Sequence, residues 1–256
     1  MRCRKIKGNL IIETKHYTVV LSRARGGSIL YLFHLKSSEN KREGCEIGPY
    51  SKGEVTSRLV NQKEWMESHY EQEFGGVGNF KVETSPSTIK VEVKSNLGSP
   101  KKPHRIYGWC ENNWTFRDDI PLISCDFKIG QPKQTRSHFK KYICVKPNFY
   151  THWAYQKDGE VFSSSINKQH PAQAPRWDII PEWITFFNQN EGLAMFPPNP
   201  ELWRGETYWF NIWCTKTMDE LLYACVFNKK EINLTMNYVI YPTTPEEKYH
   251  VLEEMM

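Results

Sequence analysis

The chain lacks a hydrophobic run long enough to cross a lipid bilayer. Hydrophobic residues make up 39% of it, and none of its apolar runs approaches the roughly 18 residues of a membrane-spanning helix. The N-terminal segment MRCRKIKGNLIIETK carries the charges of a signal peptide, but too few apolar residues precede Glu13 to form its hydrophobic region. We therefore expect a soluble, cytoplasmic protein without a membrane partner.

Cysteine and histidine pairs at metal-ligand spacing are also missing. No CxxC pair occurs, and no His lies at short ligand spacing from two cysteines. Isolated cysteines fit buried free thiols in a reducing compartment better than a zinc site or a disulfide framework. We expect no metal and no other cofactor. The cysteines are Cys3, Cys45, Cys110, Cys125, Cys144, Cys214 and Cys225.

Signatures of nucleic-acid, nucleotide and serine-hydrolase chemistry are absent as well. The 34 basic residues are balanced by 29 acidic ones, and the basic segments 101–105 and 136–141 are short. The run GGVG at 75–78 matches neither GxGxxG nor a P-loop, and no GxSxG elbow occurs. We expect no nucleic-acid partner, and the sequence leaves the oligomeric state open.

What the chain does have is alternation of apolar and polar residues. In 88-TIKVEVKS-95, Ile89, Val91 and Val93 alternate with charged residues, which predicts a strand with one buried and one solvated face. Such strands are typical of antiparallel sheets. Turn residues separate these runs, so we expect an all-β fold, a large antiparallel β-sandwich of two packed sheets. The predicted strands are 10–13, 17–22, 28–35, 88–95, 122–129, 142–145, 183–187, 193–196, 207–214 and 234–241.

Helical signals are confined to one or two short segments. The clearest is 218–228, where Thr217 can cap the helix and Glu220, three residues on, can complete a capping box. The tail 245–256 is a second candidate. No repeat, low-complexity tract or linker interrupts the strands, so we expect one β-sandwich domain over residues 1–256.

The segment 175-PRWDIIPEWITFFNQNEGLAMF-196 combines a predicted hairpin with a crowd of polar and aromatic residues. Two apolar runs are joined by NQNEG, whose Asn and Gly residues suit a short hairpin loop. Arg176, Trp177 and Glu182 precede the first run. Loops at a sheet rim commonly carry binding groups, so this approach is a candidate border of a binding cleft.

Aromatic residues are the most informative part of the composition. They make up 14% of the chain, with nine tryptophans, and exposed indoles can stack on the apolar faces of pyranose rings while nearby polar groups bind the hydroxyls. The alternative is that these rings only fill the core of a wide sandwich. The candidate substrate-binding tryptophans, each close to a polar residue, are Trp109, Trp153, Trp177 and Trp183.

Several titratable residues are candidates for proton transfer. In 148-NFYTHWAYQKDGE-160, His152 is a candidate proton carrier because imidazoles as a class exchange protons near neutral pH, and a nearby Tyr can be tuned to act as acid or base. A lone His beside aromatic residues is also a common structural residue, and HxxxE at His69 and Glu73, which would share a face of a helix, is a weak metal or acid–base signal. The candidate catalytic residues are His69, His138, His152, Tyr155, Arg176 and Glu182.

Three segments resemble one known superfamily in their order along the chain. They are 19-VVLSRARGGSILYLFHL-35, with paired glycines before a strand, 114-WTFRDDIPLISCDFKI-129, and the turn and strand 188-NQNEGLAMF-196. This order resembles the galactose mutarotase-like β-supersandwich, a superfamily of sugar epimerases, polysaccharide lyases and glycosidase-associated domains. The resemblance implies two large twisted antiparallel sheets with a concave face that binds sugar. It also implies His, Glu, Tyr or Arg chemistry, which no segment here matches residue by residue.

These observations support three hypotheses about function. The first is a carbohydrate-active protein that binds a sugar on a concave sheet and acts as an epimerase or a lyase through His, Tyr or Glu proton transfer. The second is a noncatalytic carbohydrate-binding or interaction module. The third is a structural protein whose aromatic residues are core. An enzyme requires at least two titratable groups that converge, which distinguishes the first hypothesis from the second.

Overall fold

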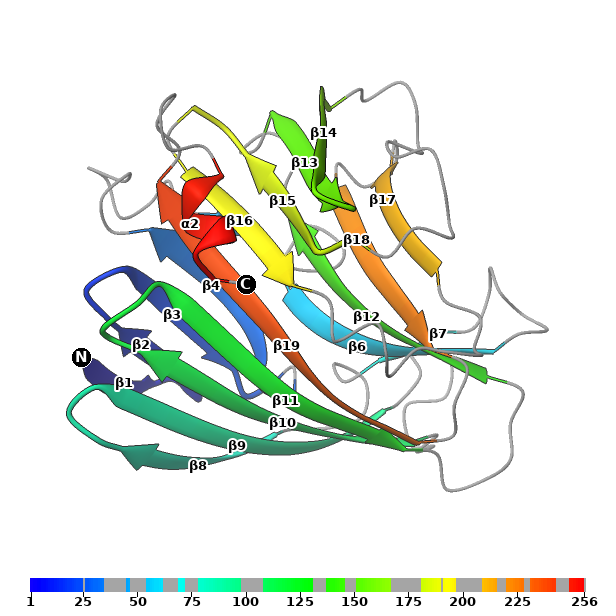
Figure 1. Ribbon diagram of the computed structural model, residues 1–256. Coiled ribbons are helices and arrows are strands. Elements are labelled where there is room, and N and C mark those ends of the chain that lie inside the picture. Colours follow the sequence, from blue (N-terminus) through cyan, green and yellow to red (C-terminus); the bar gives the residue numbers. More distant parts are fainter. Residues whose placement is uncertain are drawn as a thin grey trace.

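The protein is described by a computed structural model, and the regular elements among its described residues are β-strands and one short helix near the C-terminus (Figure 1). The structure describes residues 1–24, 26–34, 45–46, 54–61, 69–71, 78–97, 108–130, 137–145, 151–166, 181–189, 191–196, 209–215, 220–227, 231–242 and 249–255. Within these ranges no helix has the length and apolar character that a membrane crossing requires.

The strands form two large antiparallel sheets. The ten-stranded sheet has the order β1-β2-β3-β4-β6-β12-β18-β17, with β5 paired to β4 and β7 to β6. Its strands are β1 (Arg2–Ile6), β2 (Asn9–Glu13), β3 (Tyr17–Ser22), β4 (Ser28–His34), β5 (Cys45–Glu46), β6 (Glu54–Asn61), β7 (His69–Glu71), β12 (Ser137–Val145), β17 (Trp209–Thr215) and β18 (Glu220–Phe227).

The second sheet has nine strands in the order β14-β13-β15-β16-β19-β11-β10-β9-β8. They are β8 (Asn79–Thr84), β9 (Thr88–Leu97), β10 (Gly108–Arg117), β11 (Leu122–Gly130), β13 (His152–Lys157), β14 (Glu160–Ser165), β15 (Trp183–Phe187), β16 (Glu191–Phe196) and β19 (Glu231–Pro242). The short helix α2 (His250–Glu253) lies over β16 and β19 (Figure 1). The predicted all-β sandwich is confirmed.

Alternation along the strands places the core between the sheets. In β10, Cys110, Trp114 and Phe116 are buried, whereas Trp109 and the other residues of the opposite face are exposed or half-buried. The two sheets meet where the turn after β3 approaches β9. Gly27 adopts a φ of +82°, and a Cβ there would lie 2.4 Å from a methyl group of Val93, so only glycine allows this approach.

The hairpin predicted around NQNEG is present. Strands β15 and β16 pair with Phe187 opposite Gly192. The backbone N–H of Asn188 donates to the carbonyl of Glu191, and the Asn188 side chain accepts the N–H of Glu191. This side-chain bond replaces a backbone turn contact and explains why Asn suits the position.

The helix predicted over 218–228 is wrong, because most of that segment is strand β18. It pairs with β12 on one side and β17 on the other. A capping box supplies only local hydrogen bonds, whereas two neighbouring strands satisfy the whole backbone of this apolar segment. Of the described part of the predicted tail helix, residues 249–255, His250–Glu253 is helical, whereas residues 245–248 and 256 lie outside the described ranges.

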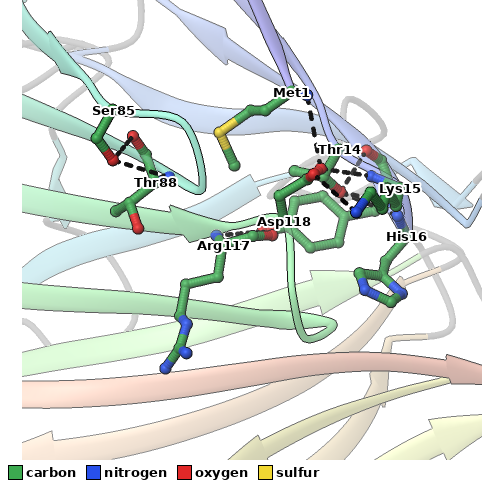
Figure 2. A network of polar contacts seen from close by, with 9 residues as sticks. Met1, Thr14, Lys15, His16, Ser85, Thr88, Arg117 and Asp118 are labelled. Carbon is green, nitrogen blue, oxygen red and sulfur yellow. Dashed lines mark hydrogen bonds and ion pairs between the residues drawn. The ribbon is translucent and has the colours of Figure 1, made fainter.

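A polar junction joins the two sheets at the loop between β10 and β11. The hydroxyl of the buried Tyr17 accepts the backbone N–H of Arg117 at 3.2 Å and donates to the carbonyl of Leu122 at 3.1 Å. Asp118 accepts the backbone N–H of Lys15 at 2.9 Å, and the Lys15 ammonium and the Met1 nitrogen lie within 3.7 Å of its carboxylate (Figure 2). Both contacts tie β2 and β3 of one sheet to β10 and β11 of the other.

Tyr17→Phe tests the first of these contacts. Removing the hydroxyl leaves the Arg117 N–H and the Leu122 carbonyl without this partner in a buried site, and we expect a loss of about 1–3 kcal/mol in the free energy of unfolding. Urea denaturation measures it. A loss below about 0.5 kcal/mol, the usual range for surface substitutions, would show that water replaces the hydroxyl at no cost.

Asp118→Asn tests the second contact through its pH dependence. Burial would raise the pKa of the Asp118 carboxyl, but the Lys15 N–H and the nearby positive charges outweigh it, so this pKa lies below its usual value. The carboxylate therefore stabilises the fold above the unfolded pKa of about 3.9, and this contribution disappears as pH falls through the folded pKa.

We expect Asp118→Asn to lower the midpoint of urea unfolding at pH 7 and to lower it less at pH 3. Asp119→Asn is the control, because Asp119 pairs with Arg117 at an exposed position where an ion pair contributes little. An equal loss for Asp118→Asn at both pH values would assign the effect to shape and not to charge.

Candidate functional site

Two of the predicted catalytic histidines come together in the ten-stranded sheet. His69 of β7 lies opposite Val60 of β6, and His138 of β12 lies opposite the same Val60 from the other side. Directly opposite residues share a face of a sheet, and two strand spacings separate their Cα atoms by about 10 Å. Register therefore brings the two histidines to one level and one face, although many residues of chain separate them.

The face of β6, β7, β12 and β17 that carries this pair is called the histidine face. Ile29, a core residue, lies opposite Val55 and therefore shares its face. Val60 lies five positions after Val55, an odd number, so it points to the other face of the sheet. The histidine face is thus the one that Ile29 does not share. Register adds polar and aromatic residues to it. They are Arg58 opposite Glu71 and Lys140, Tyr142 opposite Thr56, and Trp209, Asn211 and Trp213 of the edge strand β17.

Sequence reasoning found His69 and His138 but missed their neighbours. The spacing of His69 and Glu73 would place both side chains on one face of a helix. In the structure His69–Glu71 is a strand, and Glu73 lies outside the described residues. Arg58, Glu71, Tyr142, Trp209 and Trp213 carry no motif. Alternation of residues within one strand predicts which of its side chains share a face, but it does not predict which strands are paired, so it could not have brought these residues together.

A second polar surface lies on the nine-stranded sheet. It is called the open face, meaning the face of β8, β9, β10 and β11 that points away from the buried core residues. In Figure 1 no described helix or strand lies over it, in contrast to β16 and β19 beneath α2. Its residues alternate with the core positions and include Lys81, Glu83, Lys90, Glu92, Lys94, Trp109, Glu111, Asn113, Thr115, Asp126 and Lys128.

Trp109 is the predicted substrate-binding tryptophan that stands on this open face. Its side chain is 37% exposed. It lies opposite Gly130, and a Cβ at Gly130 would lie 2.5 Å from the indole. The indole thus occupies the space that a side chain at position 130 of β11 would need, so glycine is required there.

Charged residues of the open face are paired with one another. The Lys94 ammonium lies 3.2 Å from a Glu92 oxygen and 3.5 Å from a Glu111 oxygen, and the Asn113 amide donates to Glu111 at 3.2 Å. The hydrogen bond that Lys94 donates to Glu92 lowers the pKa of Glu92, and the same bond, together with the charge of Glu111, raises the pKa of Lys94. Lys81 lies within 3.9 Å of both Glu83 and Glu92.

The other predicted tryptophans that the structure describes are core residues. Trp183 has no exposed surface and stacks on Tyr249 at 5.3 Å beside α2, within a cluster that includes Phe187 and Tyr241. Trp153 is 6% exposed and stacks on Tyr155 at 5.9 Å. Neither fits the predicted role of sugar platform, because no ring face is open to a ligand.

The remaining predicted catalytic residues do not converge. His152 is exposed and stacks on Phe187 at 5.3 Å, whereas Glu182 accepts the N–H of Gly159 at the other end of β13, about 13 Å along the strand. Burial raises the pKa of Tyr155, which disfavours the phenolate that a base requires. Arg176 and Trp177 lie outside the described residues, and no described group of three His, Cys, Asp or Glu residues forms a metal site.

Comparison with known proteins shows the fold and not a family. No family model matches the chain, and no curated protein matches its sequence. Among solved structures, an α-mannosidase from Enterococcus faecalis is similar, with a TM-score of 0.63, 10% identity, and coverage of 95% of this chain and 30% of that one. The chain thus spans less than a third of the mannosidase.

A GalM/aldose epimerase homologue from C. elegans is similar over nearly its whole length. Its TM-score is 0.54 at 9% identity, with coverage of 93% of this chain and 99% of that one. An α-galactosidase from Geobacillus stearothermophilus gives 0.51 at 8% identity, over 98% of this chain and 42% of that one. The fold of this chain is therefore shared with these proteins, and the predicted resemblance is confirmed at the level of fold.

We expect two tryptophans of the nine-stranded sheet, Trp183 and Trp109, to respond differently to substitution. Trp183→Ala removes a fully buried indole, and we expect a loss of about 3–5 kcal/mol in the free energy of unfolding. Trp109→Ala removes an exposed ring on the open face, and we expect a loss below about 1 kcal/mol. Urea denaturation of both variants distinguishes them. Equal losses would contradict the assignment of Trp183 to the core and Trp109 to a surface.

Proposed function

We propose that the protein is a carbohydrate-active enzyme of the epimerase type, in which His69 and His138 exchange protons with a sugar on the histidine face. The observation that carries this proposal is that both histidines lie opposite Val60, on one face and about 10 Å apart. This is the convergence of two titratable groups that separates an enzyme from a binding module. An imidazole titrates near neutral pH and serves as acid or base there.

The proposed reaction is the interconversion of the anomers of an aldose. One histidine takes the proton of the anomeric hydroxyl while the other gives a proton to the ring oxygen, and the bond between the anomeric carbon and the ring oxygen breaks. Rotation of the open-chain aldehyde and the reverse proton transfers close the other anomer. The reaction needs no further reactant, and each histidine returns to its starting state after a full cycle.

The neighbouring residues give this surface the composition of a sugar site. Trp209 and Trp213 provide aromatic rings, and Arg58, Glu71 and Asn211 provide groups that pair with hydroxyls. The fold likeness to an aldose epimerase homologue supports the same reaction class. A lyase, which acts on uronates, also fits the basic residues Arg58 and Lys140, and the experiment below separates the two activities.

His69→Asn and His138→Asn test the proposal. Asn keeps a hydrogen-bonding side chain but cannot exchange a proton near neutral pH, so we expect each variant to lose about 100-fold or more in kcat. Polarimetry on freshly dissolved aldoses measures anomer interconversion, and absorbance of the unsaturated product measures lyase activity on uronate oligosaccharides.

His16→Asn is the matched control, because His16 lies in the loop between β2 and β3, away from β6, β7 and β12, and we expect it to retain full activity. A wild-type kcat/KM that rises and falls with pH around neutrality supports a histidine acid and base. Wild-type protein without activity on any aldose overturns the proposal, as does activity that survives in both histidine variants.

A further inference from the structure

We infer that the open face around Trp109 is a second carbohydrate-binding surface, separate from the histidine face, and that it takes an uncharged glycan chain. Trp109, Glu111, Asn113 and Thr115 share this face along β10. They belong to the nine-stranded sheet, whereas His69 and His138 belong to the ten-stranded one. The surface therefore adds to the proposed reaction and does not depend on it.

The aromatic part of the surface is a flat, accessible ring. The Trp109 indole is 37% exposed and rests where Gly130 has no side chain. Exposure of this apolar ring to water costs free energy. The apolar face of a sugar ring that stacks on the indole would remove this surface from water.

The charges of the surface favour an uncharged ligand. The Lys94 ammonium is bound by two carboxylates, Glu92 and Glu111, so its charge is already balanced. Glu111 follows Trp109 by two residues on the same face and is paired with Lys94, so the two charges offset each other and give little attraction for the carboxylate of a uronate. Its oxygens and the Asn113 amide instead match the donors and acceptors of neutral hydroxyls.

The length of the surface favours a chain over a single sugar. From Trp109 to Arg117, β10 spans about 27 Å, several times the size of one pyranose ring. The polar residues of β10 are flanked along this length by Glu92 and Lys94 of β9 and by Asp126 and Lys128 of β11. Affinity that grows with chain length is the expected signature.

The experiment measures binding of a series of neutral oligosaccharides, from one to six sugars, to the full chain by isothermal titration calorimetry. Uronate oligosaccharides of the same lengths are measured beside them. We expect neutral chains to bind more tightly as they lengthen and uronates to bind at least about tenfold more weakly. Trp109→Ala should weaken the longest neutral chain by about tenfold or more.

Two variants serve as controls. Phe162→Ala removes an aromatic ring that is 42% exposed on β14, at the far edge of the same sheet, and should bind the chain like the wild type. His138→Asn should also retain binding, because it lies on the other sheet. Loss of chain binding in His138→Asn with retention in Trp109→Ala overturns the inference and leaves the histidine face as the binding site.

Three further results would also overturn the inference. They are absence of binding by every neutral chain, tighter binding of uronates than of neutral chains, and self-association of the protein that Trp109→Ala abolishes. Activity of the wild type on aldoses is measured separately, so failure of this inference is distinguishable from failure of the proposed reaction.

Discussion

Antiparallel register is the constraint on which both candidate surfaces depend. Successive residues of a strand face opposite sides, so a slip of one residue would exchange the two faces of every strand in the pair. The slip would turn Trp114 and Phe116 of β10 toward solvent and Trp109 toward the core. Burial of the alternate side chains between the sheets therefore fixes the register, and register fixes which functional residues share a face.

The junction of Tyr17 and Asp118 limits how the two sheets lie relative to each other. Both residues bind backbone groups of the opposite sheet, and backbone groups cannot change rotamer as side chains do. Tyr17 and Asp118 are both buried. Because little water competes for their hydrogen bonds there, these contacts contribute more to stability than they would at the surface. The sandwich is thus held at this end by directional contacts as well as by apolar packing.

The two proposed surfaces lie on different sheets. The histidine face carries His69 and His138, whereas the open face carries an exposed indole and paired charges. We propose proton transfer on the first surface and glycan binding on the second, so that the two proposals can be tested independently. The similar mannosidase contains this fold as less than a third of its length, so the fold also occurs as one part of a larger enzyme.

The sequence by itself determined the fold class and most of the strands, because alternation of apolar and polar residues is a local property that burial of one face requires. It also determined which residue types were available, including His69, His138 and Trp109. It could not determine that β18 is a strand. The segment contains a local capping box that predicts a helix, whereas its pairing with β12 and β17 involves residues distant in the chain and leaves no sign within the segment itself. The positions of these residues became known only from the tertiary structure. His69 and His138 lie opposite the same Val60, Trp153 and Trp183 are buried in the core, and Trp109 lies on a surface. The physical reason is that strand pairing and sheet packing bring together residues that are distant in the chain.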